Sequence, residues 1–187
     1  MRAFVAVDCS SAAPGVARAR EPFVDREGLR PTDPEQAHLT LRFLGDVEGA
    51  LPGRPDRPEG TAREPSRPSA AVDASLGEYD VEGLATLVGA LESALDASGV
   101  GPFDCSLGGY GVFPSLDYVS VVWLGVESGG EALARLAAAC ESAVTDLGFD
   151  PADHAFTPHV TLARMDHAAE KDHVRRVVTG RHPEAGT

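Results

Sequence analysis

Two short stretches of the chain nearly repeat each other: "AHLTLRFLGD" at residues 37–46 and "PHVTLARMDH" at residues 158–167. Each contains a histidine, an apolar residue, a threonine and a leucine, in that order. The first stretch alternates apolar and polar side chains, which is typical of a β-strand with one buried face, and the second is also expected to be a strand. Because residues i and i+2 of a strand point to the same side, we expect His38 with Thr40, and His159 with Thr161, to project together.

In the first stretch, strict alternation predicts that Arg42 shares the face of His38 and Thr40. The other face would then carry Leu39, Leu41 and Phe43. If the two strands lie side by side, two imidazoles and two hydroxyls converge on one cleft. A single strand histidine would more often be a structural residue, and the repeated pattern is what favours a functional site.

The surrounding elements also fall into two similar halves. We expect strands at residues 2–7, 37–45, 117–126 and 156–165, and a strand followed by a turn within residues 102–115. Helices are expected from Ser10 or Ser11 to about Gly28, and at residues 81–99, 129–149 and 168–180, with a proline-broken loop at residues 29–36. This order predicts an α+β fold of two pseudo-symmetric lobes within one domain, residues 1–187.

Between the halves, residues 46–78 are rich in Pro, Arg, Glu, Gly and Ser and contain few large apolar side chains. Such a segment buries too little surface to offset its ordering entropy, so we expect a disordered surface insert. An arm that tracks RNA is a less favoured interpretation of its arginines.

The composition is strongly acidic. Asp and Glu number 29 against 16 basic residues, of which only Lys171 is a lysine, and the net charge is −13. This balance normally argues against a nucleic-acid partner, but it is also typical of proteins from salt-loving archaea. In molar salt the screening length falls to about 3 Å, so the local charge in the cleft decides what binds. We favour a halophilic source.

Cysteine usage and apolar runs indicate the compartment. Cys9, Cys105 and Cys140 are far apart and lack metal-binding spacing, so we expect free thiols in a reducing environment. The first residues do not form a secretory signal, and no run approaches the roughly 20 apolar residues of a membrane span. We therefore expect a cytoplasmic protein without a membrane partner.

Two imidazoles and two hydroxyls in one cleft suit the opening of a cyclic phosphodiester. This reaction needs a base to deprotonate water and an acid to protonate the departing ribose oxygen, and imidazole can serve as either near neutral pH. The hydroxyls can donate hydrogen bonds to the phosphate oxygens. The chemistry requires no metal, and His154, His167, His173 and His182 fit no metal-binding pattern.

The motifs "HLTLRFLG" and "HVTLAR", with "RAFVAVD" and "LGGYGVFPS…VSVVWLGV" around them, closely resemble the 2H phosphoesterases. Within these, the chain is similar to the RNA 2′,3′-cyclic phosphodiesterases, also called 2′-5′ RNA ligases, over residues 1–45 and about 79–175. The resemblance implies antiparallel sheets that face each other across a groove, with helices outside. It also implies hydrolysis of 2′,3′-cyclic phosphate at RNA ends to a 2′-phosphomonoester, without metal or cofactor.

Site roles follow from the same resemblance. His38 is expected to protonate the departing O3′, His159 to activate water, and Thr40 and Thr161 to hold the phosphate. Arg164 is expected near the substrate phosphates. Phe43 would stack on the terminal base, for which a bulge after Arg42 would be needed; a core position is an equally favoured interpretation.

The chain departs from the pattern of its relatives in the insert and in an apparently missing C-terminal strand. Candidate substrates are RNA 3′ ends with a 2′,3′-cyclic phosphate, tRNA fragments among them, bound by a monomer. Three alternatives stay open: 2′-5′ RNA ligation in the same site, a non-catalytic module that binds RNA ends, and a hydrolase of small nucleotide-sugar cyclic phosphates. Water at roughly 55 M favours hydrolysis over ligation.

Overall fold

The structure is a computed structural model, and it describes residues 2–46 and 81–186. The predicted insert at residues 46–78 therefore lies outside the described residues, except for Asp46. The single-domain prediction for residues 1–187 extends over the same gap and stays a prediction.

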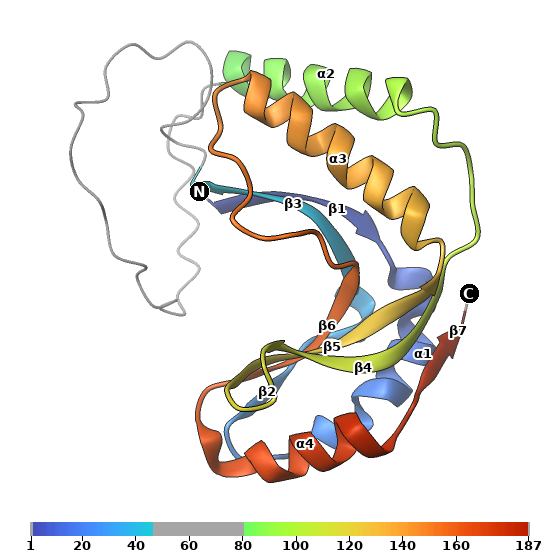
Figure 1. The fold of residues 1–187 in the computed structure, drawn as a ribbon, viewed down its shortest axis with the longest axis vertical. Helices are drawn as coiled ribbons and strands as arrows, with labels where there is room; N and C mark the ends of the chain where they lie inside the picture. Colours follow the sequence, from blue (N-terminus) through green and yellow to red (C-terminus); the bar gives the residue numbers. More distant parts are fainter. Residues whose placement is uncertain (1, 47–80, 187) are drawn as a thin grey trace, which may run out of the picture.

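Seven strands and four α-helices form the described part of the chain (Figure 1). In chain order they are β1 (Arg2–Asp8), α1 (Ala13–Arg20), β2 (Leu29–Pro31), β3 (His38–Asp46), α2 (Val81–Ala97), β4 (Ser106–Pro114), β5 (Val119–Ser128), α3 (Gly130–Asp146), β6 (His159–Met165), α4 (Lys171–Gly180) and β7 (Glu184–Gly186). The predicted α+β class is confirmed.

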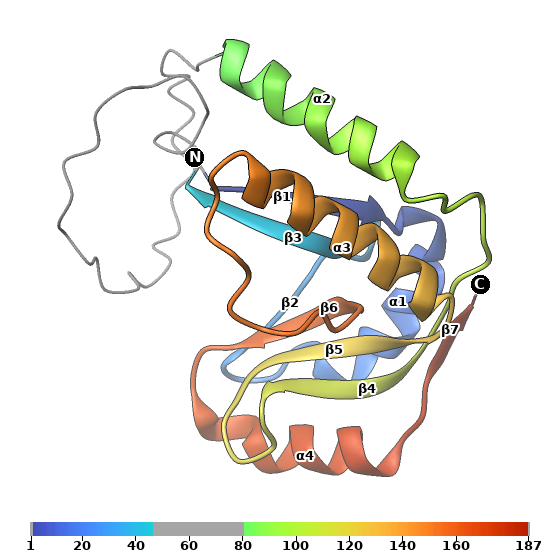
Figure 2. The ribbon, with the colours of Figure 1, turned by 45° about the horizontal axis from the view of Figure 1, so that its top comes forward.

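All strands pair antiparallel in one sheet of order β1-β3-β6-β5-β4-β7, with β2 added to β6. The β3–β6 contact is a single bridged pair, Leu39 with Val160, whereas the neighbouring strand pairs run over five residues or more. The sheet bends sharply there (Figures 1 and 2). The two expected sheets are thus two halves of one hydrogen-bonded path, hinged where the two histidine motifs meet.

Helices cover the outside of each half. Helix α3 packs on β3 and carries α2 on its outer side, whereas α1 and α4 lie against the half made by β6, β5, β4 and β7 (Figure 2). One apolar core connects these layers, and its most buried members include Phe23, Val122, Leu124, Leu133 and Leu162. This burial orients the strands and leaves the opposite face of the sheet for polar groups.

Two short strands were not predicted from the sequence. Residues 29–31 were expected in a loop but form β2, whose partners are residues 163–165. Beyond the last helix, β7 pairs with Leu107 and Gly108 of β4. Its Ala185 packs against the backbone of Gly15 in α1, where any side chain would collide with the Ala185 carbonyl. Strands of three residues carry too little periodicity to be predicted.

Local boundaries also differ from the expectation. The first helix is shorter than predicted, because 3₁₀ turns at Ser10–Ala12 and Glu21–Phe23 flank α1. The three cysteines are free thiols, as predicted, and burial raises the pKa of Cys9 to about 11. None of the described helices has the length and apolarity that a membrane span requires.

Candidate active site

The two histidine motifs lie side by side at the hinge of the sheet. Leu39 of β3 is paired with Val160 of β6, and both side chains are 1% exposed. Their neighbours in each strand must therefore project to the other face, which brings His38 and Thr40 beside His159 and Thr161. The two strands run antiparallel, so the histidine of each motif lies across from the threonine of the other. The charge of His38 reaches His159 and contributes to its pKa.

The same backbone contact holds both imidazoles. Nδ1 of His38 lies 2.9 Å from the carbonyl oxygen of Gln36, and Nδ1 of His159 lies 2.7 Å from that of Thr157. A carbonyl oxygen only accepts hydrogen bonds, so Nδ1 is the protonated nitrogen in each ring. Nε2 of both histidines is consequently the atom that exchanges a proton with a ligand.

Each motif has a leucine directly after its threonine, and each strand has a bulge at that leucine. The bulge changes which of the following side chains lies on the face of the histidine. In β1, alternate residues Phe4, Ala6 and Asp8 pair with Phe43, Thr40 and His38, whereas Val5 pairs with Arg42. Strand β1 alternates regularly, so Phe43 shares the face of His38 and Arg42 does not. The register shift falls between Thr40 and Arg42, which makes Leu41 the extra residue.

The second motif repeats this arrangement. Val121, Trp123 and Gly125 of β5 pair with Arg164, Thr161 and His159, and the register shifts between Thr161 and Ala163. The extra residue is here Leu162, the counterpart of Leu41. Arg164 therefore shares the face of His159, and its charge contributes to the lowered pKa of that histidine.

Two expectations about β3 are corrected by the bulge. Arg42 was expected beside His38 but lies on the core side with its side chain 11% exposed, where Nε contacts Glu141 of α3 at 2.5 Å. Phe43 is 61% exposed, so its core interpretation is wrong, and its ring centroid lies 6.2 Å from that of Phe4. The bulge that turns Phe43 toward His38 lies before Arg42, and a second register shift follows between Phe43 and Gly45.

The surroundings of the two imidazoles differ. His38 is exposed and stacks on the ring of Phe4, with centroids 5.1 Å apart and an interplanar angle of 21°. His159 is half-buried between Phe113 and Trp123, whose ring centroids lie 4.9 and 5.9 Å from its own. Burial lowers the pKa of His159 and the hydrogen bond to Thr157 opposes this effect, whereas the charges of Arg164 and His38 lower the pKa further.

Polar groups complete the face. No described residue forms a hydrogen bond with the side-chain hydroxyl of Thr40 or Thr161. Thr32, which directly follows β2, donates a hydrogen bond from its hydroxyl to the carbonyl oxygen of Thr161 at 2.7 Å. This bond holds the segment after β2 against β6. Among residues 2–46 and 81–186, no group of three or more His, Cys, Asp or Glu side chains is placed to hold a metal ion.

Three aromatic residues of the site were not predicted as site residues: Phe4, Phe113 and Trp123. Their segments flank the two histidine motifs in the sequence. Each comes from a strand other than the one that carries its histidine, so the contact arises from strand pairing and leaves no local signal in the sequence. The alternation in β1, β4 and β5 could have identified them only once the register was known.

Comparison with known proteins places the chain in a family. Residues 7–186 match the model of the 2′-5′ RNA ligase superfamily, and the chain belongs to that superfamily. It is 28% identical to an RNA 2′,3′-cyclic phosphodiesterase of Methanothermobacter thermautotrophicus, over 95% of this chain and 78% of that protein. It is 31% identical to the protein of the same name from Archaeoglobus fulgidus, over 88% of this chain and 73% of that protein.

The fold is also found among solved structures. The crystal structure of TT0787 of Thermus thermophilus matches with a TM-score of 0.64 and 25% identity, covering all of this chain and 82% of that one. The predicted resemblance at the level of the superfamily is therefore confirmed.

Proposed function

We propose that this protein hydrolyses RNA 2′,3′-cyclic phosphate ends to 2′-phosphomonoesters by acid–base catalysis between His38 and His159. The observation that carries the proposal is the antiparallel meeting of β3 and β6, which sets two imidazoles and two threonines on one face. The relatives named RNA 2′,3′-cyclic phosphodiesterases support the choice of substrate.

The chemistry follows from the two Nε2 atoms. In the proposed reaction, Nε2 of His159 takes a proton from water while the water oxygen forms a bond to phosphorus. The P–O3′ bond breaks, and Nε2 of His38 donates its proton to O3′. The products are a 3′-hydroxyl and a 2′-phosphomonoester, and each imidazole ends in the protonation state in which the other began. A positioned acid or base contributes roughly 10² to 10⁴-fold.

The division of labour between the histidines follows from burial. A base must be neutral before the reaction, and burial between Phe113 and Trp123 lowers the pKa of His159, which favours its neutral form. The other histidine, His38, is then left as the acid, and its exposed ring lies against Phe4 at the open side of the site. These surroundings support His159 as the base and His38 as the acid.

The remaining residues would bind the substrate. The hydroxyls of Thr40 and Thr161 are suited to donate hydrogen bonds to the non-bridging oxygens as charge develops there. Arg164 would add positive charge near the phosphate, which this acidic chain otherwise supplies sparsely. Phe43, exposed beside Phe4, would stack on the terminal base, a contact worth roughly 1–3 kcal/mol.

The first test is hydrolysis of a short RNA with a 2′,3′-cyclic phosphate end, in molar KCl with EDTA. We expect wild type to form a 2′-phosphate, and His38→Ala and His159→Ala each to lose at least about 10²-fold in kcat. His154→Ala is the matched control, because His154 is an exposed histidine outside the site and its replacement should leave the rate unchanged. A wild type that is folded but inactive would overturn the proposal.

Other outcomes would select the alternatives. Ligation of RNA ends at a rate above that of hydrolysis would favour 2′-5′ RNA ligation in the same site. RNA binding that survives His38→Ala, with no turnover by wild type, would favour a non-catalytic end-binding module. Turnover of mononucleotide-sized cyclic phosphates without any activity on RNA would indicate a small-molecule hydrolase.

The setting of this activity is part of the same proposal. We expect a monomer in the cytoplasm that acts on RNA 3′ ends, with tRNA fragments among the substrates to be tested, and that needs no cofactor. A halophilic source is expected from the acidic composition.

A further inference from the structure

Two arginines lie directly opposite each other at the edge of the candidate site. Arg30 of β2 is paired with Arg164 of β6, and both residues are exposed. Directly opposed residues of an antiparallel pair have their Cβ atoms about 4.5–5.5 Å apart on the same face, and like charges at that separation repel. The chain has 29 acidic and only 16 basic residues, and two of the basic residues form this like-charged pair.

The pair lies on the face of the two histidines. Arg164 shares the face of His159 and Thr161, because all three pair with alternate residues of the regular strand β5. Arg30 is paired with Arg164 and therefore projects to the same side, whereas the flanking Leu29 turns into the core. Strand β2 adjoins β6 beyond the point where β3 meets it, so Arg30 extends the site along β6.

The side chain of Arg30 is held in place from one side only. Its Nε and Nη2 atoms contact Oδ1 of Asp166 at 2.9 and 2.7 Å. A guanidinium has five N–H donors, so Nη1 and part of Nη2 stay outside this contact and can donate to an anion. The side chains of Arg30 and Asp166 are 58% and 44% exposed, and an ion pair of that kind is worth little by itself.

The distance along β6 between His159 and the two arginines indicates which phosphate of the substrate they would bind. Arg164 is five residues from His159, and at about 3.3 Å per residue its Cα lies roughly 16 Å along the strand, less the shortening at the bulge. Arg164 lies on the face of His159, and its charge contributes to the lowered pKa of that histidine. Arg30 lies opposite Arg164, on the edge of β6 where β3 pairs at Val160, so the two guanidinium groups extend the site along β6 away from the paired histidines.

We propose that Arg30, beside Arg164, forms a subsite for an internal phosphodiester of the RNA strand, one or two nucleotides 5′ of the cyclic end. This inference rests on the proposed function of the site and adds a binding contact that distinguishes RNA from a mononucleotide. Guanidinium groups bind phosphate oxygens through paired, charge-assisted hydrogen bonds. The subsite supplies local positive charge in a chain whose net charge is −13.

The test compares a nucleoside 2′,3′-cyclic phosphate, which has no upstream phosphate, with a trinucleotide that ends in the same group. Arg30→Gln should lower kcat/KM for the trinucleotide about tenfold and leave the mononucleotide within about twofold, because one charge-assisted contact is lost only from the longer substrate. Arg30→Lys should retain part of the preference, since it keeps the charge but not the fork.

The matched control is Arg175→Gln. Arg175 on α4 makes an equally short contact with Asp117 at 2.8 Å and is 40% exposed, but α4 covers the other face of the sheet. This variant should treat both substrates as wild type does. An equal loss of kcat/KM on both substrates in Arg30→Gln, or no loss on either, would overturn the subsite.

Binding separates this inference from the catalytic proposal. The affinity for a trinucleotide that already carries a 2′-phosphate end can be measured by fluorescence anisotropy at several KCl concentrations. Arg30→Gln should lower the salt dependence of log Kd by about 0.7, the share of one phosphate contact in a single strand. An unchanged slope would overturn the subsite even if catalysis fails, and a changed slope would support it in either case.

Discussion

Two chemically identical side chains acquire different properties at the residue scale. Both histidines use Nδ1 to contact the carbonyl oxygen two residues earlier, so both present Nε2. Their neighbours then separate them: His38 faces solvent with Phe4 along one side of its ring, whereas Phe113 and Trp123 shield His159. Shielding lowers the pKa of His159, because a charged imidazole is poorly solvated there.

The pH profile should report this shielding. The acid limb of log(kcat/KM) reflects protonation of the base, and a low pKa of His159 extends activity toward lower pH. Phe113→Ala exposes His159 to water, so the pKa of His159 should rise and the acid limb should move to higher pH. The alkaline limb, which reflects loss of the proton from the acid, should stay in place.

Initial rates from pH 4.5 to 9.5 on the cyclic-phosphate substrate measure both limbs. An acid limb that stays in place in Phe113→Ala, whatever the change in kcat, would contradict the assignment of His159 as the base shielded by Phe113. A flat profile for wild type would contradict the two-histidine mechanism itself, because that mechanism requires one charged and one neutral imidazole.

At the element scale, the bulges determine the composition of the site. Without an extra residue at Leu41 and Leu162, strict alternation would turn Phe43 and Arg164 away from the histidines. The bulges bring both onto the site face and direct Arg42 to Glu141 of α3. The leucine shared by the two motifs is therefore the residue at which each strand changes register.

Strand β4 contributes through a glycine. The indole of Trp123 lies over Gly111 in the neighbouring strand, and a Cβ at Gly111 would collide with the ring. Gly111→Ala should displace Trp123 from its place beside His159. We expect the free energy of unfolding to fall by about 1–3 kcal/mol, as for other overpacked sites, and kcat to fall with it.

Gly89→Ala is the matched control for this substitution. Gly89 lies in α2, where an added Cβ meets nothing within 4 Å. Alanine there should raise the free energy of unfolding by about 0.5–1 kcal/mol through its higher helix propensity. Urea unfolding of both variants measures the two changes, and a neutral effect of Gly111→Ala would contradict the packing of Trp123 described above.

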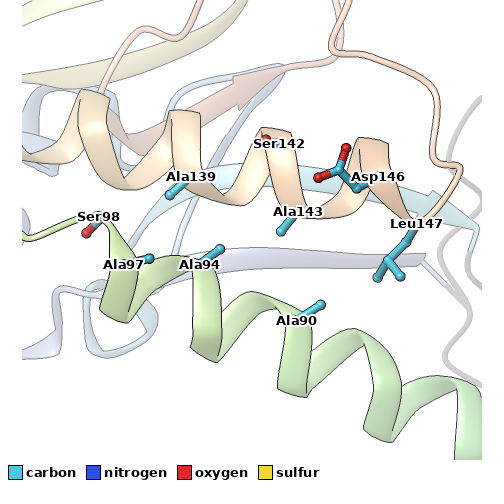
Figure 3. Close-up of a pocket in the computed structure, with 9 residues that line it drawn as sticks. All are labelled: Ala90, Ala94, Ala97, Ser98, Ala139, Ser142, Ala143, Asp146 and Leu147. Atoms are coloured by element: carbon cyan, nitrogen blue, oxygen red, sulfur yellow. The ribbon is translucent and has the colours of Figure 1, made fainter.

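A cavity of about 420 Å³ lies between α2 and α3 (Figure 3). Small side chains line it, among them Ala90, Ala94 and Ala143, with Asp146 and Leu147 at one end. Alanines from the two helices face each other across it, and Leu147 also packs against a small core formed by Leu87, Val144 and Phe149. No residue of the candidate site lines this cavity.

At the scale of the whole molecule, net charge should govern the response to salt. A charge of −13 repels itself in the compact state, and this repulsion is screened within about 3 Å at 1 M salt. We expect Tm to rise steeply with KCl up to roughly 1 M and to level off beyond it.

Thermal unfolding followed by circular dichroism from low to molar KCl tests this expectation. Screening saturates, whereas exclusion of a solute from the surface keeps increasing with concentration, so the shape of the curve separates the two causes. A matched series in sucrose provides the comparison. A Tm that does not change with KCl would contradict both the role of charge and the expected halophilic source.

The residues and faces predicted from the sequence depended on local information. Alternation placed His38, Thr40, His159 and Thr161 on strands, and helical spacing located α2, α3 and α4 within a few residues, because both periodicities are set by the backbone of one segment. The repeated motif also indicated that the two strands belong together. Strands β2 and β7, with three residues each, contained too few positions to show a period.

Contacts between segments were decided only by the tertiary structure. The bridge from Leu39 to Val160, the bulges at Leu41 and Leu162, and the aromatic neighbours of each histidine depend on which strands pair and in what register. So does the meeting of Arg30 with Arg164. Register reflects the packing of the entire core, so the sequence by itself determined which side chains carry the chemistry, and the pairing of strands determined what surrounds them.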